Sequence, residues 1–424
     1  MSTALALVII VAVAYLATHV AFDWAARRFL IVSGAEYLLL GILVGPQVSG
    51  LVTAHTIDSF APLTTLALGW VGAIVGTQFR IPELVRIPGV MFRLAFAEAL
   101  ATLGVVGGLL GLALMWLFDL TPALAAVPAI ALGGIAAVSA PAGIEVVARH
   151  TGARGPIVRQ LQVCTAIDAL VAIVAVGLLA CVQRPPADGG VRPLTPTEWA
   201  VVSVALGLVG GALFHLFLGR ERNVDRLVIS LGGAVILISG AAAYLQLSPL
   251  LAAMVFGATL ANTSRSRAEI GETLARGERP FYFVLLIFAG IAWQPSAREW
   301  AVPVVLFLLT RAVGKIGGAR LGARLAGTLP VFGAHWGRAL LGQGGLALAL
   351  AFDYVQQGGS PLSNIVFTAA IASVLLTDLS SAHLVQATVL PLLESEVSPR
   401  RVAARFLTPR SREQAAGRPT AGGD

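Results

Sequence analysis

The chain has 424 residues, of which 57% are hydrophobic and only 12% are charged. A soluble protein of this length typically carries about twice that fraction of charge, so the composition excludes an ordinary soluble domain. The formal net charge of +7 would suit a nucleic-acid-binding protein, but the arginines lie in short loops between apolar segments and form no basic face. We therefore expect the chain to meet the lipid bilayer and no nucleic acid.

Apolar segments of about 20 residues recur along the whole chain, and this is the length that a helix needs to span a bilayer. In hydrocarbon the backbone must satisfy its own hydrogen bonds, so the segments are expected to be helices. A transmembrane barrel would show a series of short segments with alternating hydrophobicity, and the sequence has no such series. The thirteen expected spans are 3–22, 36–52, 59–79, 89–117, 122–147, 156–181, 198–218, 226–244, 247–262, 280–294, 299–319, 333–355 and 361–389.

The distribution of basic residues predicts how these spans are oriented. Of the 29 lysines and arginines, this assignment puts 24 on one side of the membrane, 3 on the other and 2 inside the eleventh span. Because basic residues accumulate in cytoplasmic loops, we expect the N-terminus outside and the C-terminus in the cytoplasm of a bacterial inner (plasma) membrane. We expect the first span to remain uncleaved, one transmembrane domain over 1–395, and a short disordered cytoplasmic tail over 396–424.

Two basic residues, Arg311 and Lys315, lie within the eleventh span. A charge at this depth is costly and usually marks a pathway or a relay. Lys315 is the only lysine in the chain, and a buried lysine can release its proton whereas an arginine cannot. Arg311 lies one turn away on the same face, and it is either part of the function or a structural partner of an acidic residue.

Asp168 is the clearest acidic candidate, because it lies near the middle of the sixth span with no other charge in the eight preceding residues. An isolated carboxylate at this depth either pairs with a cation or stays protonated, and both states suit exchange of a proton for a metal ion. The alternative is a static ion pair that holds spans together. Glu98 and Asp378 also lie inside spans and are secondary candidates.

Two spans contain helix-breaking residues at their centres. The segments are Ser139-Ala140-Pro141-Ala142-Gly143 in the fifth span and Gly342-Gln343-Gly344-Gly345 in the twelfth. Such breaks free backbone carbonyls and amides at mid-membrane, and their occurrence in two halves of a sequence indicates a transporter site. The offset of seven spans predicts that spans 2–6 and 9–13 form inverted repeats. Alternatively, the glycines merely allow close helix packing, although that explanation does not account for Pro141.

Several stretches, in this order, resemble the cation:proton antiporter superfamily, and in particular its Kef-like second branch, the monovalent cation:proton antiporter-2 group. They are 37–46 (YLLLGILVGP), 139–141 (SAP), Asp168, 247–262 (LSPLLAAMVFGATLAN), 280–290 (PFYFVLLIFAG), 311–315 (RAVGK) and 340–350 (LLGQGGLALAL). The resemblance implies an all-α fold of about 13 transmembrane helices with two crossed broken helices. It also implies a homodimer with a mobile core, roughly 89–181 and 299–389, a scaffold formed by the remainder, and no cofactor.

By the same resemblance, Asp168 binds the ion and the proton, and Lys315 is the cation that pairs with it. Many relatives carry two adjacent acids or Asn-Asp here. If Asp168 occupies the first position, Ala169 replaces the usual ion-binding carboxylate; we favour the register that keeps Asp168 at the ion position. Thr165, Ser139 and the freed carbonyls would complete an oxygen site for Na⁺ or K⁺.

With one carboxylate, exchange of one cation for one proton would be electroneutral, and family members move in an elevator-like manner. A membrane enzyme is disfavoured, because the six histidines have no metal-ligand spacing and no nucleophile motif is present. The remaining alternatives are a transporter of organic anions or other solutes, a symporter, and a transport-inactive sensor or channel.

Overall fold

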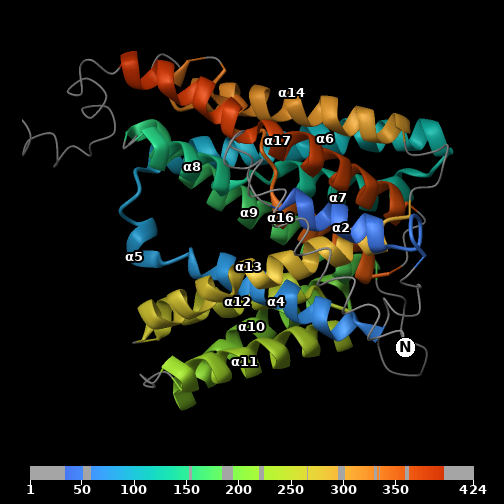
Figure 1. Ribbon diagram of the computed structural model, residues 1–424, viewed down its shortest axis with the longest axis vertical. Coiled ribbons are helices and arrows are strands. Elements are labelled where there is room, and N and C mark those ends of the chain that lie inside the picture. Colours follow the sequence, from blue (N-terminus) through green and yellow to red (C-terminus); the bar gives the residue numbers. More distant parts are fainter. Residues whose placement is uncertain are drawn as a thin grey trace, which may run out of the picture.

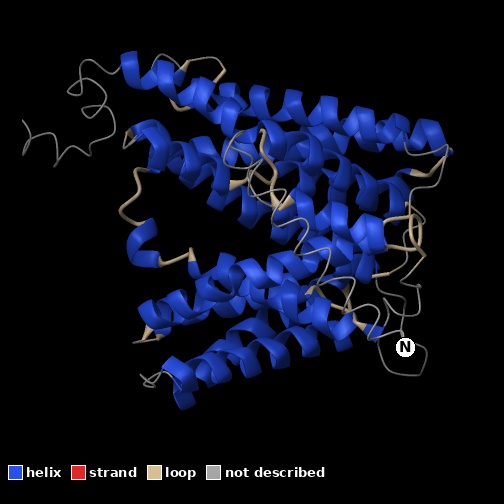
Figure 2. Cartoon of the chain, viewed as in Figure 1, coloured by secondary structure: helices blue, strands red, loops and turns tan. Residues whose placement is uncertain are grey.

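The computed structural model describes residues 34–50, 59–151, 155–183, 194–218, 224–264, 266–294, 301–328, 332–333, 335–358 and 362–395. Across these ranges the chain forms helices and contains no strand (Figure 2). The expected first span, 3–22, and the expected tail, 396–424, lie outside the described residues.

Each of the twelve expected spans from residue 36 onward corresponds to one helix or to a pair of short helices. The elements are α2 (Ala35–Val44), α4 (Ala61–Thr77), α5 (Ile81–Leu84), α6 (Gly89–Phe118), α7 (Pro122–Ala137), α8 (Pro141–Thr151), α9 (Pro156–Gln183), α10 (Pro196–Leu218), α11 (Val224–Tyr244), α12 (Pro249–Thr263), α13 (Arg267–Ala292), α14 (Ala301–Leu325), the 3-10 helix η1 (Trp336–Leu340), α16 (Gly345–Gln356) and α17 (Ser363–Ser395). The predicted all-α architecture is therefore confirmed.

Helix ends differ from the expected bounds by several residues, and the largest difference is at the start of α13. The tenth span was placed at 280–294, but α13 begins at Arg267 and passes through Pro280. The added segment is polar enough to lie outside a purely apolar window, yet Ile270 and Leu274 are buried on one face. The burial of this face stabilises the charged segment as an amphipathic helix, and hydropathy alone does not detect where such a helix begins.

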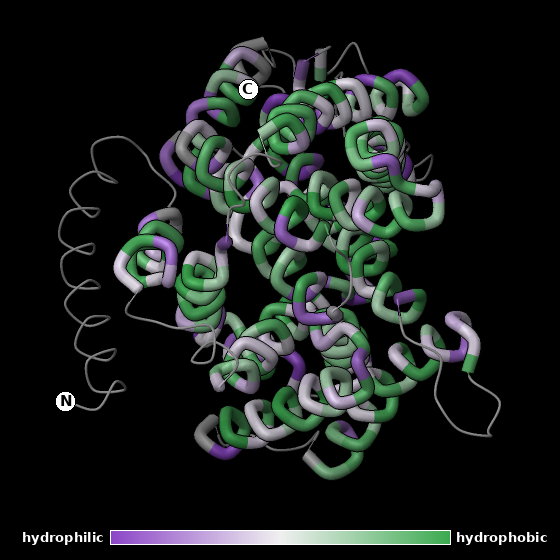
Figure 3. Tube along the Cα trace, turned by 90° about the vertical axis from the view of Figure 1, so that its right-hand side faces the viewer, coloured by the Kyte–Doolittle hydropathy of each residue, from purple (hydrophilic) through white to green (hydrophobic). Residues whose placement is uncertain are grey.

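In the described part of the chain, six helical segments are long and apolar enough to cross a membrane, and the bent pair Ser363–Asp378 and Ser380–Pro391 would make a seventh. The six are Gly89–Phe118, Pro122–His150, Pro156–Gln183, Pro196–Phe217, Arg226–Tyr244 and Ala301–Leu325. Shorter apolar helices, including α4, α12 and α16, pack among them. Hydrophobic residues predominate along the helices in the view of Figure 3. The chain is a multi-pass membrane protein.

The helices form two groups (Figure 1). The first, here named the site bundle, contains α6, α7, α8, α9, α14, η1, α16 and α17. The second bundle contains α4 and α10 to α13, with α2 packed along α13. The short helix α5 lies in the connection that leads from α4 to α6, at one end of the molecule.

Glycines on α14 let it lie very close to α6. A Cβ atom at Gly318 would be 2.9 Å from the carbonyl oxygen of Glu98, and one at Gly314 would be 3.2 Å from the Cα atom of Thr102. Small residues permit such close backbone approach in membrane bundles. This contact brings the segment that carries Lys315 against the segment that carries Glu98.

Candidate ion-binding site

The two predicted helix breaks are present and touch each other, although about 200 residues separate them in the sequence. The first lies between the end of α7 at Ala137 and the start of α8 at Pro141, whose nitrogen carries no hydrogen. The second lies between η1 and α16, where Gly344 has a φ of +70° that favours glycine. The backbone N–H of Ala140 donates to the carbonyl of Gly342 at 2.8 Å.

Side chains add further hydrogen bonds between the two breaks. The hydroxyl of Ser139 donates to the carbonyl of Leu340 at 3.0 Å. The Nε2 atom of Gln343 donates to the carbonyl of Ile135 at 2.7 Å. These bonds reach carbonyls in the last turn of α7 and at the end of η1, where a helix leaves its backbone acceptors incompletely satisfied.

The two buried cations of α14 bind other backbone carbonyls at the two breaks. Arg311 donates to the carbonyl of Leu341 at 2.6 Å and to that of Val138 at 3.0 Å. Lys315 donates through Nζ to the carbonyl of Ala137. The C-terminal end of a helix carries partial negative charge, so cations stabilise both interrupted ends. The hydrogen-bond partners of Arg311 are therefore carbonyls of the two breaks rather than the acidic partner considered from the sequence.

Asp378 performs the complementary task at the start of α16. Its Oδ1 atom accepts hydrogen bonds from the backbone N–H groups of Gly344, at 2.9 Å, and Gln343, at 3.2 Å. The N-terminal end of a helix carries partial positive charge, and a carboxylate stabilises it. Asp378 lies on α17, so this helix contributes to holding the twelfth-span break.

Three buried ionic side chains lie together next to the first break. The Nζ atom of Lys315 lies 2.8 Å from Oδ2 of Asp168 on α9 and 3.1 Å from Oε1 of Glu98 on α6. All three side chains have no exposed surface. Thr102, one turn after Glu98, donates to Glu98 Oε1 at 3.0 Å. We name Glu98, Asp168 and Lys315 the ionic triad.

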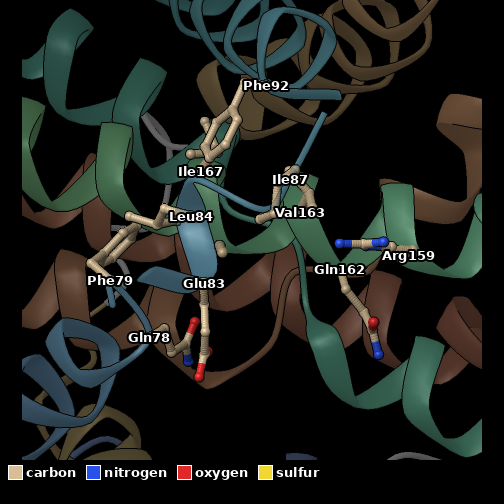
Figure 4. A pocket seen from close by; sticks show the side chains of 11 residues that line it. Gln78, Phe79, Glu83, Leu84, Ile87, Phe92, Arg159, Gln162, Val163 and Ile167 are labelled. Atoms are coloured by element: carbon tan, nitrogen blue, oxygen red, sulfur yellow. The ribbon is translucent and has the colours of Figure 1, made fainter. Parts of the chain in front are cut away.

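A cavity of about 280 Å³ lies between the α4–α5 segment and the site bundle (Figure 4). Its walls are formed by Gln78, Phe79, Glu83, Leu84, Ile87, Phe92, Arg159, Gln162, Val163, Ala166 and Ile167. Apolar side chains line the part toward Phe92 and Ile167, and polar side chains gather near Glu83 and Arg159. Ile167 is the residue directly before Asp168, so the cavity reaches the α9 turn that carries the carboxylate.

Comparison with known proteins identifies the family. The profile described as "Sodium/hydrogen exchanger, transmembrane" matches residues 37–387. The chain belongs to the sodium/hydrogen exchanger family. No curated protein matches it by sequence. The resemblance to the cation:proton antiporter superfamily is thus confirmed, and the matched family is one of transporters.

Solved structures support the same fold for this exchanger-family chain. The structure of the sodium proton antiporter MjNhaP1 from Methanocaldococcus jannaschii at pH 8 has a TM-score of 0.68 and 16% identity, covering 93% of this chain and 99% of that one. A second MjNhaP1 structure, from an electron-microscopy map, has a TM-score of 0.64 and 15% identity, covering 94% and 99%. At this identity the likeness concerns the fold.

The remaining predicted site residues of this exchanger lie around the triad and the breaks. Thr165 is one turn before Asp168, and its hydroxyl donates to the carbonyl of Gln162 at 2.9 Å, which leaves its oxygen lone pairs free to accept. Gly143 and Gly342 both face Ser381 of α17, because a Cβ atom at either would lie 2.3 Å from its hydroxyl. These two glycines are therefore needed for α17 to pack against both breaks.

From the sequence, Glu98 is only a secondary candidate and Thr102 is not a candidate. Gly314 and Gly318 could have indicated both residues, because small residues on either side of Lys315 predict a close contact with another helix. Ala169, the residue after Asp168, packs within the largest cluster of buried apolar residues.

Proposed function

We propose that this protein exchanges a monovalent cation, Na⁺ or K⁺, for H⁺ across the bacterial inner membrane. The observation that carries the proposal is the fully buried Asp168, held by Lys315 beside two crossed helix breaks. A buried charge inside a membrane protein is costly, and its presence beside two interrupted helices supports an ion pathway. Membership of the exchanger family supports the same reaction class.

The proposed chemistry is competition for Asp168. A dehydrated alkali cation requires several oxygen ligands, which Asp168, Thr165 and Ser139 together with break carbonyls would supply. A proton on Asp168 removes the negative charge and expels the cation, so the two flows are coupled. One cation would leave for each proton that enters, which makes the exchange electroneutral.

We further propose elevator-type alternating access, with the site bundle as the mobile core and the second bundle as a scaffold that forms a homodimer. Hydrogen bonds join the bundles from Ser248 Oγ to Asp353 Oδ2 at 2.6 Å, from Gln356 Nε2 to Thr64 Oγ1 at 2.7 Å and from Trp293 Nε1 to Thr368 Oγ1 at 3.2 Å. The cavity of Figure 4 lies at the other end of α4 from Thr64, beside the N-terminal half of α9. With the C-terminus in the cytoplasm, this arrangement corresponds to a site open to the inside.

The charge of the site disfavours transport of an organic anion. Both terminal nitrogens of Arg311 already donate to carbonyls, and the neighbouring triad contains two carboxylates against one lysine. An anion would therefore meet a site of like charge, whereas a cation would compensate it.

The experiment that tests the proposal uses the purified full chain in proteoliposomes with an internal pH-sensitive dye, to which NaCl, KCl and LiCl are added in turn. We expect one of these salts to release protons from a preset acid interior, and Asp168→Asn to abolish the response while the variant remains folded and inserted. Exchange by Asp168→Asn at the wild-type rate would exclude Asp168 as the carrier. A wild-type protein that responds to none of the three salts would exclude the exchange itself.

A further inference from the structure

The buried ionic groups around the breaks do not balance one another. Three carboxylates, Glu98, Asp168 and Asp378, face two cations, Arg311 and Lys315, so the fully ionised cluster has an excess of one negative charge. Arg311 and Asp378 bind backbone groups before and after the same break, at Leu341 and Gly344. The excess charge therefore belongs to the ionic triad.

Asp168 by itself cannot provide this excess charge, because Lys315 lies 2.8 Å from it and compensates it. A neutral pair has little net attraction for a second cation in a buried site. Glu98, at 3.1 Å from the same ammonium group, turns the neutral pair into a triad with one negative charge. Without Glu98, a cation could enter only as an uncompensated buried charge or after Lys315 had lost its proton.

Each carboxylate also has one oxygen left for a ligand. Oδ1 of Asp168 and Oε2 of Glu98 are buried, and neither has a hydrogen-bond partner within the described ranges. Their other oxygens bind Lys315, and Thr102 additionally fixes Glu98. Buried carboxylate oxygens without a donor are unfavourable unless a cation or a proton binds them.

We propose that Glu98 is a second carboxylate ligand of the transported monovalent cation, contributed by α6, and that Glu98 and Asp168 share the exchanged proton. The inference rests on the proposed cation exchange and deepens it. Lys315 stays charged throughout, so the triad is neutral with one cation and equally neutral with one proton. Ala169 leaves α9 with a single acid at this point, and the second acid reaches the site from a different helix.

Charge-changing variants separate this role from a merely structural one. Glu98→Gln keeps the shape of the side chain but makes the triad neutral, so we expect the apparent affinity for the cation to fall by roughly 100-fold or more, since a unit charge a few ångströms away is lost from a buried site. Glu98→Asp keeps the charge and is the matched control. Glu98→Gln combined with Lys315→Gln leaves Asp168 alone with one negative charge, so cation binding should recover relative to Glu98→Gln.

Binding is measured by thermal unfolding of the purified full chain in detergent, with NaCl, KCl or LiCl titrated against choline chloride at constant ionic strength. Unchanged cation affinity in Glu98→Gln overturns the proposal. Loss of binding that the double variant does not restore also overturns it, because Glu98 would then act through structure and not through charge. If Glu98→Gln does not fold, Lys315→Gln and the double variant make the same comparison, and equal affinities of these two overturn the proposal.

The same titration distinguishes this proposal from the function on which it rests. Stabilisation of the wild type by a cation, absent in Asp168→Asn but kept in Glu98→Gln, would retain the exchange and exclude Glu98 as a ligand. A wild type that no cation stabilises, and that exchanges no cation in proteoliposomes, would overturn both.

Discussion

Removing the charge of Lys315 should destabilise the protein in a way that depends on pH. Its Nζ atom compensates Asp168 at 2.8 Å and Glu98 at 3.1 Å, and it also binds the carbonyl of Ala137 at the end of α7. Removing one partner of a buried ion pair typically costs about 3–5 kcal/mol, because the remaining charge is uncompensated. Here two carboxylates and one helix end lose the same donor, so we expect the upper part of that range for Lys315→Met at alkaline pH.

The sign of the pH dependence follows from linkage. Without the lysine, the two carboxylates repel each other, and the folded state holds a proton more tightly than the unfolded chain does. Uptake of that proton relieves the repulsion, so Lys315→Met should lose stability as the pH rises and regain part of it in acid. Exchange by the variant, if any remains, should shift to higher pH for the same reason.

Unfolding in detergent, followed by tryptophan fluorescence at about pH 6, 7.5 and 9, measures this effect. Lys315→Arg is the control, because it keeps the charge but does not release a proton. Retained stability with lost exchange in Lys315→Arg would indicate that the lysine handles protons, whereas retained exchange would indicate that its charge suffices. A Lys315→Met variant that unfolds like the wild type at every pH would refute the pairing argument.

Three further predictions concern topology, packing and access. Single cysteines in the 183–197 loop should react with an impermeant thiol reagent in intact cells and cysteines in the 396–424 tail should not; reversed labelling would refute the orientation. Gly318→Leu should separate α14 from α6 and destabilise the fold by about 1–3 kcal/mol or more, with Gly317→Leu, where a Cβ meets no neighbour, as the control in the same unfolding assay. In a background without Cys164 and Cys181, a short thiol crosslinker between Ser248→Cys and Asp353→Cys should stop exchange, whereas the two single variants should retain it. Unchanged exchange after complete crosslinking would refute motion between the bundles.

Hydropathy was sufficient to predict the helices, because in a membrane protein the length of each apolar segment reflects the thickness of the bilayer. Hydropathy runs through both breaks, and these were instead predicted correctly from Pro141 and the Gly342–Gly345 run, which interrupt a regular helix. Hydropathy misplaced the start of α13, because an amphipathic segment precedes the apolar part of that helix.

The site was harder to predict because its members come from different helices. A lone lysine and a lone aspartate could be singled out by their depth, and their pairing at 2.8 Å agrees with the expectation for Lys315 and Asp168. The partners of Arg311 could not be predicted, since backbone carbonyls have no signature in the sequence. The place of Glu98 depends on how closely α6 and α14 approach, which only the packed structure fixes.

The hydrogen bonds of Arg311 bear on how the buried site could become accessible. This side chain binds a carbonyl on each break, and Ser139, Ala140 and Gln343 add three more bonds between the two interrupted helices. Opening either break by itself would leave several buried polar groups without partners, each costing about 1–3 kcal/mol. Sliding the whole site bundle against the second bundle breaks fewer of these hydrogen bonds, namely those of Asp353 with Ser248, Gln356 with Thr64 and Trp293 with Thr368. The internal connections of the site therefore favour movement of the bundle as one body.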